Sequence, residues 1–181
     1  MTTETATTTW AIDPTHSEVQ FKVKHLVIST VTGSFSQFDG AVETTGDDFT
    51  DAKISFSAAI DSISTGNVQR DGHLKSAEFF DIDNFPELTF TSTSTVKTGD
   101  DAYSVTGDLT MHGVTQPVTL TVEYGGQTQD FYGQTKAGFE INGTLKRKEF
   151  GLTWNGVTEG GGIVVSDDVK LVMNIQLTKQ A

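Results

Sequence analysis

Alternation of apolar and polar residues from Val105 to Tyr124 limits the fold more than any other stretch of this chain. The stretch reads V-T-G-D-L-T-M-H-G-V-T-Q-P-V-T-L-T-V-E-Y, and both of its arms carry the period of two that is typical of a half-buried β-strand. Between the arms, Gly113 can adopt a positive φ, and Pro117 lacks the N–H that a central strand position needs. The pattern therefore predicts an antiparallel hairpin with its turn near Gly113.

The same alternation recurs along much of the chain and predicts about eight antiparallel strands. It is found in the ranges 18–24, 29–42, 54–60, 88–96, 131–145 and 169–177. Short strands of this kind form either a sandwich of two sheets over a dry core or a closed barrel without a free edge. A barrel of about eight strands can be filled by side chains or can hold one small ligand. The number of strands leaves both architectures open.

One segment, residues 64–85, lacks the alternation and is the long excursion from the strands. We expect a short helix over about 67–76, because Asn67 is a favourable N-cap. Long excursions of this kind are often lids or plugs. Residues 1–9, M-T-T-E-T-A-T-T-T, are expected to form a flexible polar tail, and residues 10–181 a single domain.

The charge and the composition argue against several classes of function. The formal net charge is −12 at pH 7, which disfavours nucleic acid and anionic membrane surfaces as partners. The absence of cysteine removes disulfides, thiolate nucleophiles and Cys-ligated zinc. No apolar run is long enough to span a bilayer, and no signal peptide is visible. We therefore expect a cytoplasmic protein, or a periplasmic one if a native signal was removed.

The ionisable residues show no spacing that is specific for catalysis or metal binding. None of the close spacings of a metal site occurs among the histidines, which are His16, His25, His73 and His112. We expect them to be hydrogen-bonded structural residues; the alternative is a zinc or iron site from His16, His73 or His112 brought together by the fold. Asp81 could act as a catalytic carboxylate, but no nucleophile and base accompany it. We therefore predict no catalytic residue and no metal.

Several runs of residues resemble the YceI-like family, and they cover the chain from about Trp10 to its end in the family's order. The runs are D-P-T-H-S-E-V-Q-F-K-V-K-H-L at 13–26, G-S-F-S-Q-F-D-G at 33–40, R-D-G-H-L-K-S-A-E-F-F-D at 70–81, F-P-E-L-T-F-T-S at 85–92, G-D-L-T-M-H-G-V-T-Q-P-V at 107–118 and K-R-K-E-F-G-L at 146–152. The resemblance implies an all-β, lipocalin-like antiparallel β-barrel whose lumen binds a long isoprenoid chain, such as a polyprenyl or quinone tail. It is compatible with a homodimer and transfers no catalytic residues.

In such a barrel the apolar face of each strand points inward and lines the lumen, and residues of the irregular segments close its mouth. Without the resemblance, the same inward residues would be expected to fill a core. The expected lining residues are Phe21, Val23, Phe35, Phe38, Ile54, Phe56, Ile60, Phe90, Leu109, Leu120, Phe139, Ile141, Met173 and Ile175, with Leu74, Phe79, Phe80 and Trp154 at the mouth. The candidates for contact with a polar head group are His16, Arg70 and His73.

Together, these observations predict a soluble, non-catalytic protein that holds an isoprenoid lipid for sequestration, transport or storage, including during stress. Binding would come from removal of the tail from water between apolar side chains, and no cofactor is required. Two rival hypotheses remain. One is a small enzyme that acts on an apolar, isoprenoid-like substrate through Asp81 and a histidine; the other is a structural module with a filled core.

Overall fold

The computed structural model describes residues 7–26, 28–46, 48–153 and 165–180. Its strands are β1 (Thr8–Ile12), β2 (Glu18–His25), β3 (Ser29–Phe35), β4 (Phe38–Thr44), β5 (Lys53–Ala59), β6 (Ile63–Ser64), β7 (Glu87–Gly99), β8 (Ala102–Met111), β9 (Val114–Gln129), β10 (Thr135–Lys146) and β11 (Val165–Lys179). The helical elements are α1 (Val68–Lys75) and the 3₁₀ turns η1 (Pro14–His16), η2 (Ile60–Ser62) and η3 (Arg147–Phe150).

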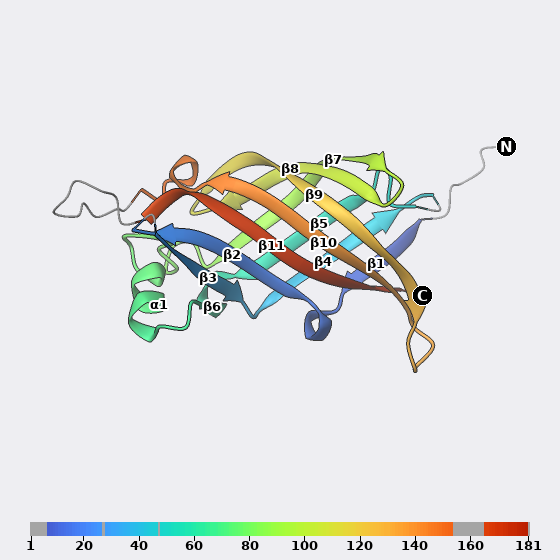
Figure 1. The fold of residues 1–181 in the computed structure, drawn as a ribbon, viewed down its shortest axis with the longest axis horizontal. Coiled ribbons are helices and arrows are strands. Elements are labelled where there is room, and N and C mark those ends of the chain that lie inside the picture. Colours follow the sequence, from blue (N-terminus) through green and yellow to red (C-terminus); the bar gives the residue numbers. More distant parts are fainter. Residues whose placement is uncertain (1–6, 27, 47, 154–164, 181) are drawn as a thin grey trace.

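All strands belong to one antiparallel sheet that closes on itself. Their order is β1-β4-β5-β7-β8-β9-β10-β11-β2-β3-β6, and an additional pairing between β1 and β11 joins Trp10 to Lys179. β1 continues into β2, β3 into β4 and β5 into β6, each across a short interruption, so the sheet is a closed barrel of 8 strands (Figure 1). The prediction of an all-β barrel is confirmed, and the sandwich is excluded.

The hairpin from which the sequence was interpreted lies in the barrel wall as β8 and β9. Its turn is formed by His112 and Gly113, which both have positive φ values of 56° and 72°. Pro117 pairs with Asp108 of β8, in the part of β9 that precedes its first pair with β10. A residue without an N–H is tolerated there because that part of β9 has a strand neighbour on one side only.

The interposed helix is confirmed within a residue at each end. Asn67 caps α1 by accepting a hydrogen bond from the Arg70 N–H at 3.0 Å, and Ser76 follows its last turn. The helix lies at the end of the barrel that is opposite to the chain termini (Figure 1). Only Ser34 and Phe35 of β3 pair with β6, so among the described residues the part of β3 from Ser29 to Gly33, nearer that end, has only β2 as a strand neighbour.

Two strand boundaries differ from the expected ones. β1 begins at Thr8, two residues before the expected boundary at Trp10. β10 begins at Thr135 instead of near Phe131, because Asp130 accepts hydrogen bonds from the Tyr132 and Gln134 N–H groups and so forms a turn. Within the described residues, no helix has the length and apolar character needed to cross a membrane.

Close packing of aromatic rings on the inner wall depends on two glycines. A Cβ atom at Gly33 would lie 2.2 Å from Cζ of Phe21. A Cβ atom at Gly107 would lie 2.5 Å from Cζ of Phe90 and 2.6 Å from the carbonyl oxygen of Thr91. Both distances are far inside van der Waals contact, so only glycine leaves room for these rings to lie against the neighbouring strand.

Candidate ligand-binding site

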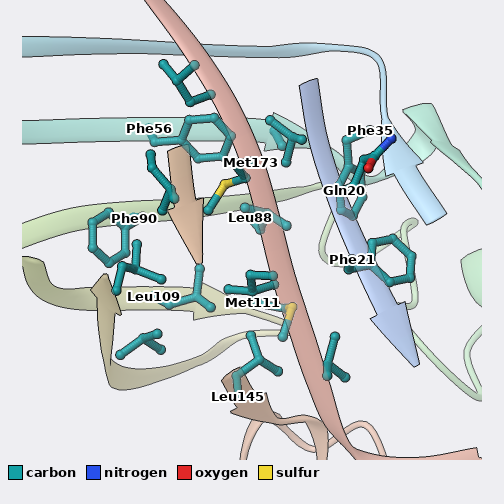
Figure 2. A pocket seen from close by; sticks show the side chains of 18 of the residues that line it. Gln20, Phe21, Phe35, Phe56, Leu88, Phe90, Leu109, Met111, Leu145 and Met173 are labelled. Atoms are coloured by element: carbon teal, nitrogen blue, oxygen red, sulfur yellow. The ribbon is translucent and has the colours of Figure 1, made fainter. Parts of the chain in front are cut away.

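The barrel encloses an apolar cavity of about 410 Å³, a size within the range of small-molecule sites. Side chains from strands that are distant in the sequence face the same space; Figure 2 shows Phe56, Leu88, Phe90, Leu109, Met111 and Met173 around it. The residues that line the cavity also belong to the hydrophobic core of the protein. The side chains of the barrel core therefore leave a cavity between them.

Most of the residues expected to line a lumen do line this cavity. They are Phe21, Val23, Phe35, Ile54, Phe56, Leu74, Phe79, Phe80, Phe90, Leu109, Leu120, Phe139, Ile141, Met173 and Ile175. Trp154 lies outside the described residues. Strand parity identified these side chains because each strand of a closed barrel presents alternate residues to the interior.

Phe38 and Ile60 were expected on the cavity wall and lie elsewhere. The Phe38 ring stacks on the Phe56 ring at a centroid distance of 6.2 Å, and Phe56 lines the cavity whereas Phe38 does not. Ile60 is 1% exposed and lies in η2, where strand β5 breaks before β6. Ile60 is therefore buried in the hydrophobic core, as its parity with Ile54 and Phe56 predicts, but it lies beyond the end of β5 and does not reach the cavity.

Phe49 closes the barrel at the end where the termini lie, and the sequence interpretation missed it. Its sequence neighbours Asp48 and Asp51 are acidic, but its own side chain is buried, with centroid distances of 4.8 Å to the Phe139 ring and 5.5 Å to the Trp10 ring. The rings of Tyr103 and Tyr124 lie at 6.4 Å and 5.6 Å. A lone aromatic residue between acidic turn residues is the signal that could have identified it.

The segment that begins with α1 contributes to the other end of the cavity. Leu74, Phe79 and Phe80 line the cavity, as expected for residues that cover its mouth. Phe79 is buried, and its ring and the His73 ring form a T-shaped pair with a centroid distance of 5.0 Å. The apolar wall therefore continues beyond the strands and onto the helical segment.

Two of the expected head-group residues, Arg70 and His73, also line the cavity at this end. The Arg70 guanidinium donates from Nε to the Thr65 hydroxyl and from Nη2 to the Thr65 carbonyl, each at 2.7 Å. His73 is hydrogen-bonded through Nε2 to the Glu78 carboxylate. These contacts hold both side chains in place beside the apolar surface.

Arg147 is a further basic residue of the cavity wall, and no sequence pattern identified it. It is 4% exposed, and its guanidinium donates to the backbone carbonyls of Leu152, Val165 and Ser166. Burial lowers the pKa of Arg147, while the nearby Asp167 carboxylate acts in the opposite direction. Because the ordinary arginine pKa is so high, the group remains a cation at neutral pH.

The third head-group candidate, His16, lies apart from Arg70 and His73. It belongs to η1, where its Nδ1 is 2.8 Å from the Asp13 carboxylate, and it does not line the cavity. The Asp13 carboxylate also accepts from the Thr15 hydroxyl and from Nζ of Lys136. These hydrogen bonds, led by Thr15 and His16, hold the pKa of Asp13 well below its usual range. Through Lys136 the cluster connects η1 to β10. His16 therefore supports this turn and does not contact the cavity.

The histidines of the metal hypothesis have separate partners, and the Asp81 of the enzyme hypothesis lies outside the cavity wall. Asp81 accepts a hydrogen bond from the Asn84 amide at 2.8 Å within a turn and does not line the cavity. His112 is hydrogen-bonded to the Phe150 carbonyl, whereas His16 is bonded to Asp13 and His73 to Glu78, so each histidine has a different partner. Within the described part of the chain, no three His, Asp or Glu side chains lie close enough to hold a metal ion.

Comparisons with known proteins agree with this architecture. The family model described as the YceI-like domain matches residues 10–177. A UPF0312 protein of Pectobacterium atrosepticum is 39% identical over 165 residues, which are 91% of this chain and 82% of that protein.

Two solved structures share the fold. The YceI protein of Campylobacter jejuni has a TM-score of 0.74 and 30% identity, over 88% of this chain and 91% of that one. A polyisoprenoid binding domain from Saccharophagus degradans has a TM-score of 0.66 and 16% identity, over 94% and 98% of the two chains, a likeness of fold alone. The extent of the family match and the identity to the relatives establish that this chain belongs to the YceI-like family.

Proposed function

We propose that this protein binds one long isoprenoid chain, of the polyprenyl or isoprenoid-quinone type, inside the barrel. The observation that carries the proposal is the enclosed apolar cavity, which Phe49 closes at one end and which basic residues border at the other. Membership of the YceI-like family supports it, as does the shared fold of the polyisoprenoid binding domain. The protein would act by sequestering, carrying or storing the lipid, without catalysis and without a cofactor.

Burial of the tail supplies the affinity in this proposal. Each buried CH₂ group contributes roughly 0.8 kcal/mol, so about twelve buried carbons contribute on the order of 10 kcal/mol before the cost of association. A tail of about forty carbons would exceed the limit of non-covalent affinity if every carbon contributed equally. A long tail is therefore held loosely over much of its length, and selectivity for tail length comes from the depth of the cavity.

Mass spectrometry of an organic extract from the gently purified protein tests the proposal. We expect a stoichiometric isoprenoid species. As a second readout, a prenyl compound at about a hundred times its Kd stabilises the folded state by about 2.7 kcal/mol, which raises the melting temperature by about 5–11 °C for a chain of this length. An empty extract together with an unchanged melting temperature would contradict the proposal and would favour the structural-module hypothesis.

A further inference from the structure

The Lys, Arg and His residues contribute five side chains to the lining of the cavity and the described carboxylates none, although the protein is strongly acidic. The five are Lys24, His25, Arg70, His73 and Arg147. The chain has twice as many Asp and Glu residues as Lys and Arg residues, 24 against 12, yet none of the described Asp and Glu residues lines the cavity. Both arginines of the whole chain are part of its wall.

These basic residues lie at the same end of the barrel. Arg147 donates a hydrogen bond to the carbonyl of Val165, and Val165 pairs with His25 at the end of β2. Arg70 and His73 belong to α1, which lies at the end toward which β2 runs (Figure 1). The opposite end is filled by the rings around Phe49. The cavity therefore has an apolar end and a cationic end.

Arg70 presents an accessible charge at this end of the cavity. Its side chain is exposed toward solvent, and Thr65 occupies only Nε and one position of Nη2. Among the described residues, Asp71 accepts from Thr65 instead of from Arg70, and Glu78 is engaged with His73. No described carboxylate lies within ion-pair distance of the Arg70 guanidinium.

We propose that the preferred ligand is an isoprenoid chain that ends in a phosphate or diphosphate group, which Arg70 binds at the cationic end of the cavity. The inference rests on the proposed isoprenoid function and adds the chemical class of the head group. A guanidinium matches phosphate oxygens with two parallel hydrogen bonds, and such charge-assisted bonds are stronger where water is partly excluded. An uncharged prenol or quinone head would bring no counter-charge to the basic residues.

Matched ligands of identical tail test the head group directly. Farnesyl diphosphate and farnesol share the same C15 chain, so the ratio of their dissociation constants, measured by titration calorimetry, isolates the contribution of the charge. We expect farnesyl diphosphate to bind about tenfold or more tightly than farnesol. We also expect this advantage to shrink between low and high salt, because exposed charges are screened.

Arg70→Gln and Lys170→Gln form a matched pair of variants. Each removes one positive charge, but Lys170 is exposed between the cavity-lining residues Val169 and Leu171 and does not line the cavity. Arg70→Gln should reduce the advantage in affinity of farnesyl diphosphate over farnesol about tenfold, whereas Lys170→Gln should leave that advantage unchanged. If the only role of Arg70 were to hold α1 against Thr65, its loss would reduce the affinities for both ligands by the same factor.

The outcomes separate the two proposals. Equal binding of farnesol and farnesyl diphosphate overturns the head-group inference and leaves the isoprenoid function in place. An unchanged ratio in Arg70→Gln overturns the assignment to Arg70. Failure of both ligands to bind the folded wild-type protein overturns the head-group inference and the proposed function together.

Discussion

Ile141→Asp places a carboxyl group inside the cavity and measures how much of the affinity comes from burial of the tail there. Ile141 pairs with Val122 on one side and with Met173 on the other, and its side chain lines the cavity. A hydrocarbon tail beside this position forces the introduced carboxyl group into its neutral form, because burial disfavours the charge. Protonating an ordinary aspartate at pH 7 costs about 4 kcal/mol. We therefore expect the affinity for the tail to fall about a thousandfold.

The sign of the effect gives a distinctive pH dependence. The bound tail raises the pKa of the introduced carboxyl group, so binding takes up a proton and becomes more favourable as the pH falls. For each unit by which the pH is lowered, the affinity of the variant should recover about tenfold. The recovery should end at a pH near 4, the ordinary aspartate pKa. Ile141→Asn introduces a side chain of the same shape as aspartate that cannot ionise. Its affinity should be reduced but should not recover as the pH falls.

Asn142→Asp provides the positional control. Asn142 is the next residue of β10, is exposed and does not line the cavity, so the same carboxyl group there should leave the affinity unchanged. The affinity of each variant for geranylgeraniol is measured by titration calorimetry between pH 5 and 8, with thermal unfolding to confirm that each variant is folded. Wild-type affinity in a folded Ile141→Asp variant at pH 7 would refute the placement of the tail beside Ile141.

Three further predictions concern stability. Phe49→Ala removes the ring that closes one end of the barrel and should lower the free energy of unfolding by about 3–5 kcal/mol in chemical denaturation; a loss below about 1 kcal/mol would show that the ring is dispensable. Asp13→Asn should destabilise the protein at pH 7, because the pKa of Asp13 is lowered in the folded state; the difference from wild type should narrow as the pH falls below about 4, and a pH-independent difference would contradict it. In Gly107→Ala the new methyl group meets a backbone carbonyl and should lower the free energy of unfolding by about 1–3 kcal/mol. In Gly143→Ala it meets only the movable end of Leu120, so the free energy of unfolding should fall less. A larger decrease in melting temperature for Gly143→Ala than for Gly107→Ala would refute this packing argument.

Local sequence patterns predicted the strands, the helix and most of the cavity wall, and the errors have a common cause. Asn67 marked the start of α1 because capping depends on a few adjacent residues. Phe38 and Ile60 share the parity of residues that line the cavity, but both lie at strand ends and pack in or against the hydrophobic core without lining the cavity. His25 could have been found, since it shares the inward parity of Phe21 on β2.

Other residues of the site could not be found in this way. Phe49 and Arg147 lie in turns, and no periodicity states which turn residue points into the protein. The run K-R-K at 146–148 contains three similar cations, of which the structure buries the middle one. His16 and Arg70 look alike as polar candidates along the chain, yet the fold separates them.

The period of two along each strand already specifies which side chains face inward, because that property depends on neighbouring residues alone. Closure of the barrel, the apolar plug at one end and the cationic character of the other depend instead on contacts between residues far apart in the sequence. Trp10 meets Lys179 across the closing strands, and Val165 connects His25 with Arg147. Such pairings follow from the register of the whole sheet, which takes shape only when all the strands bury their apolar faces together.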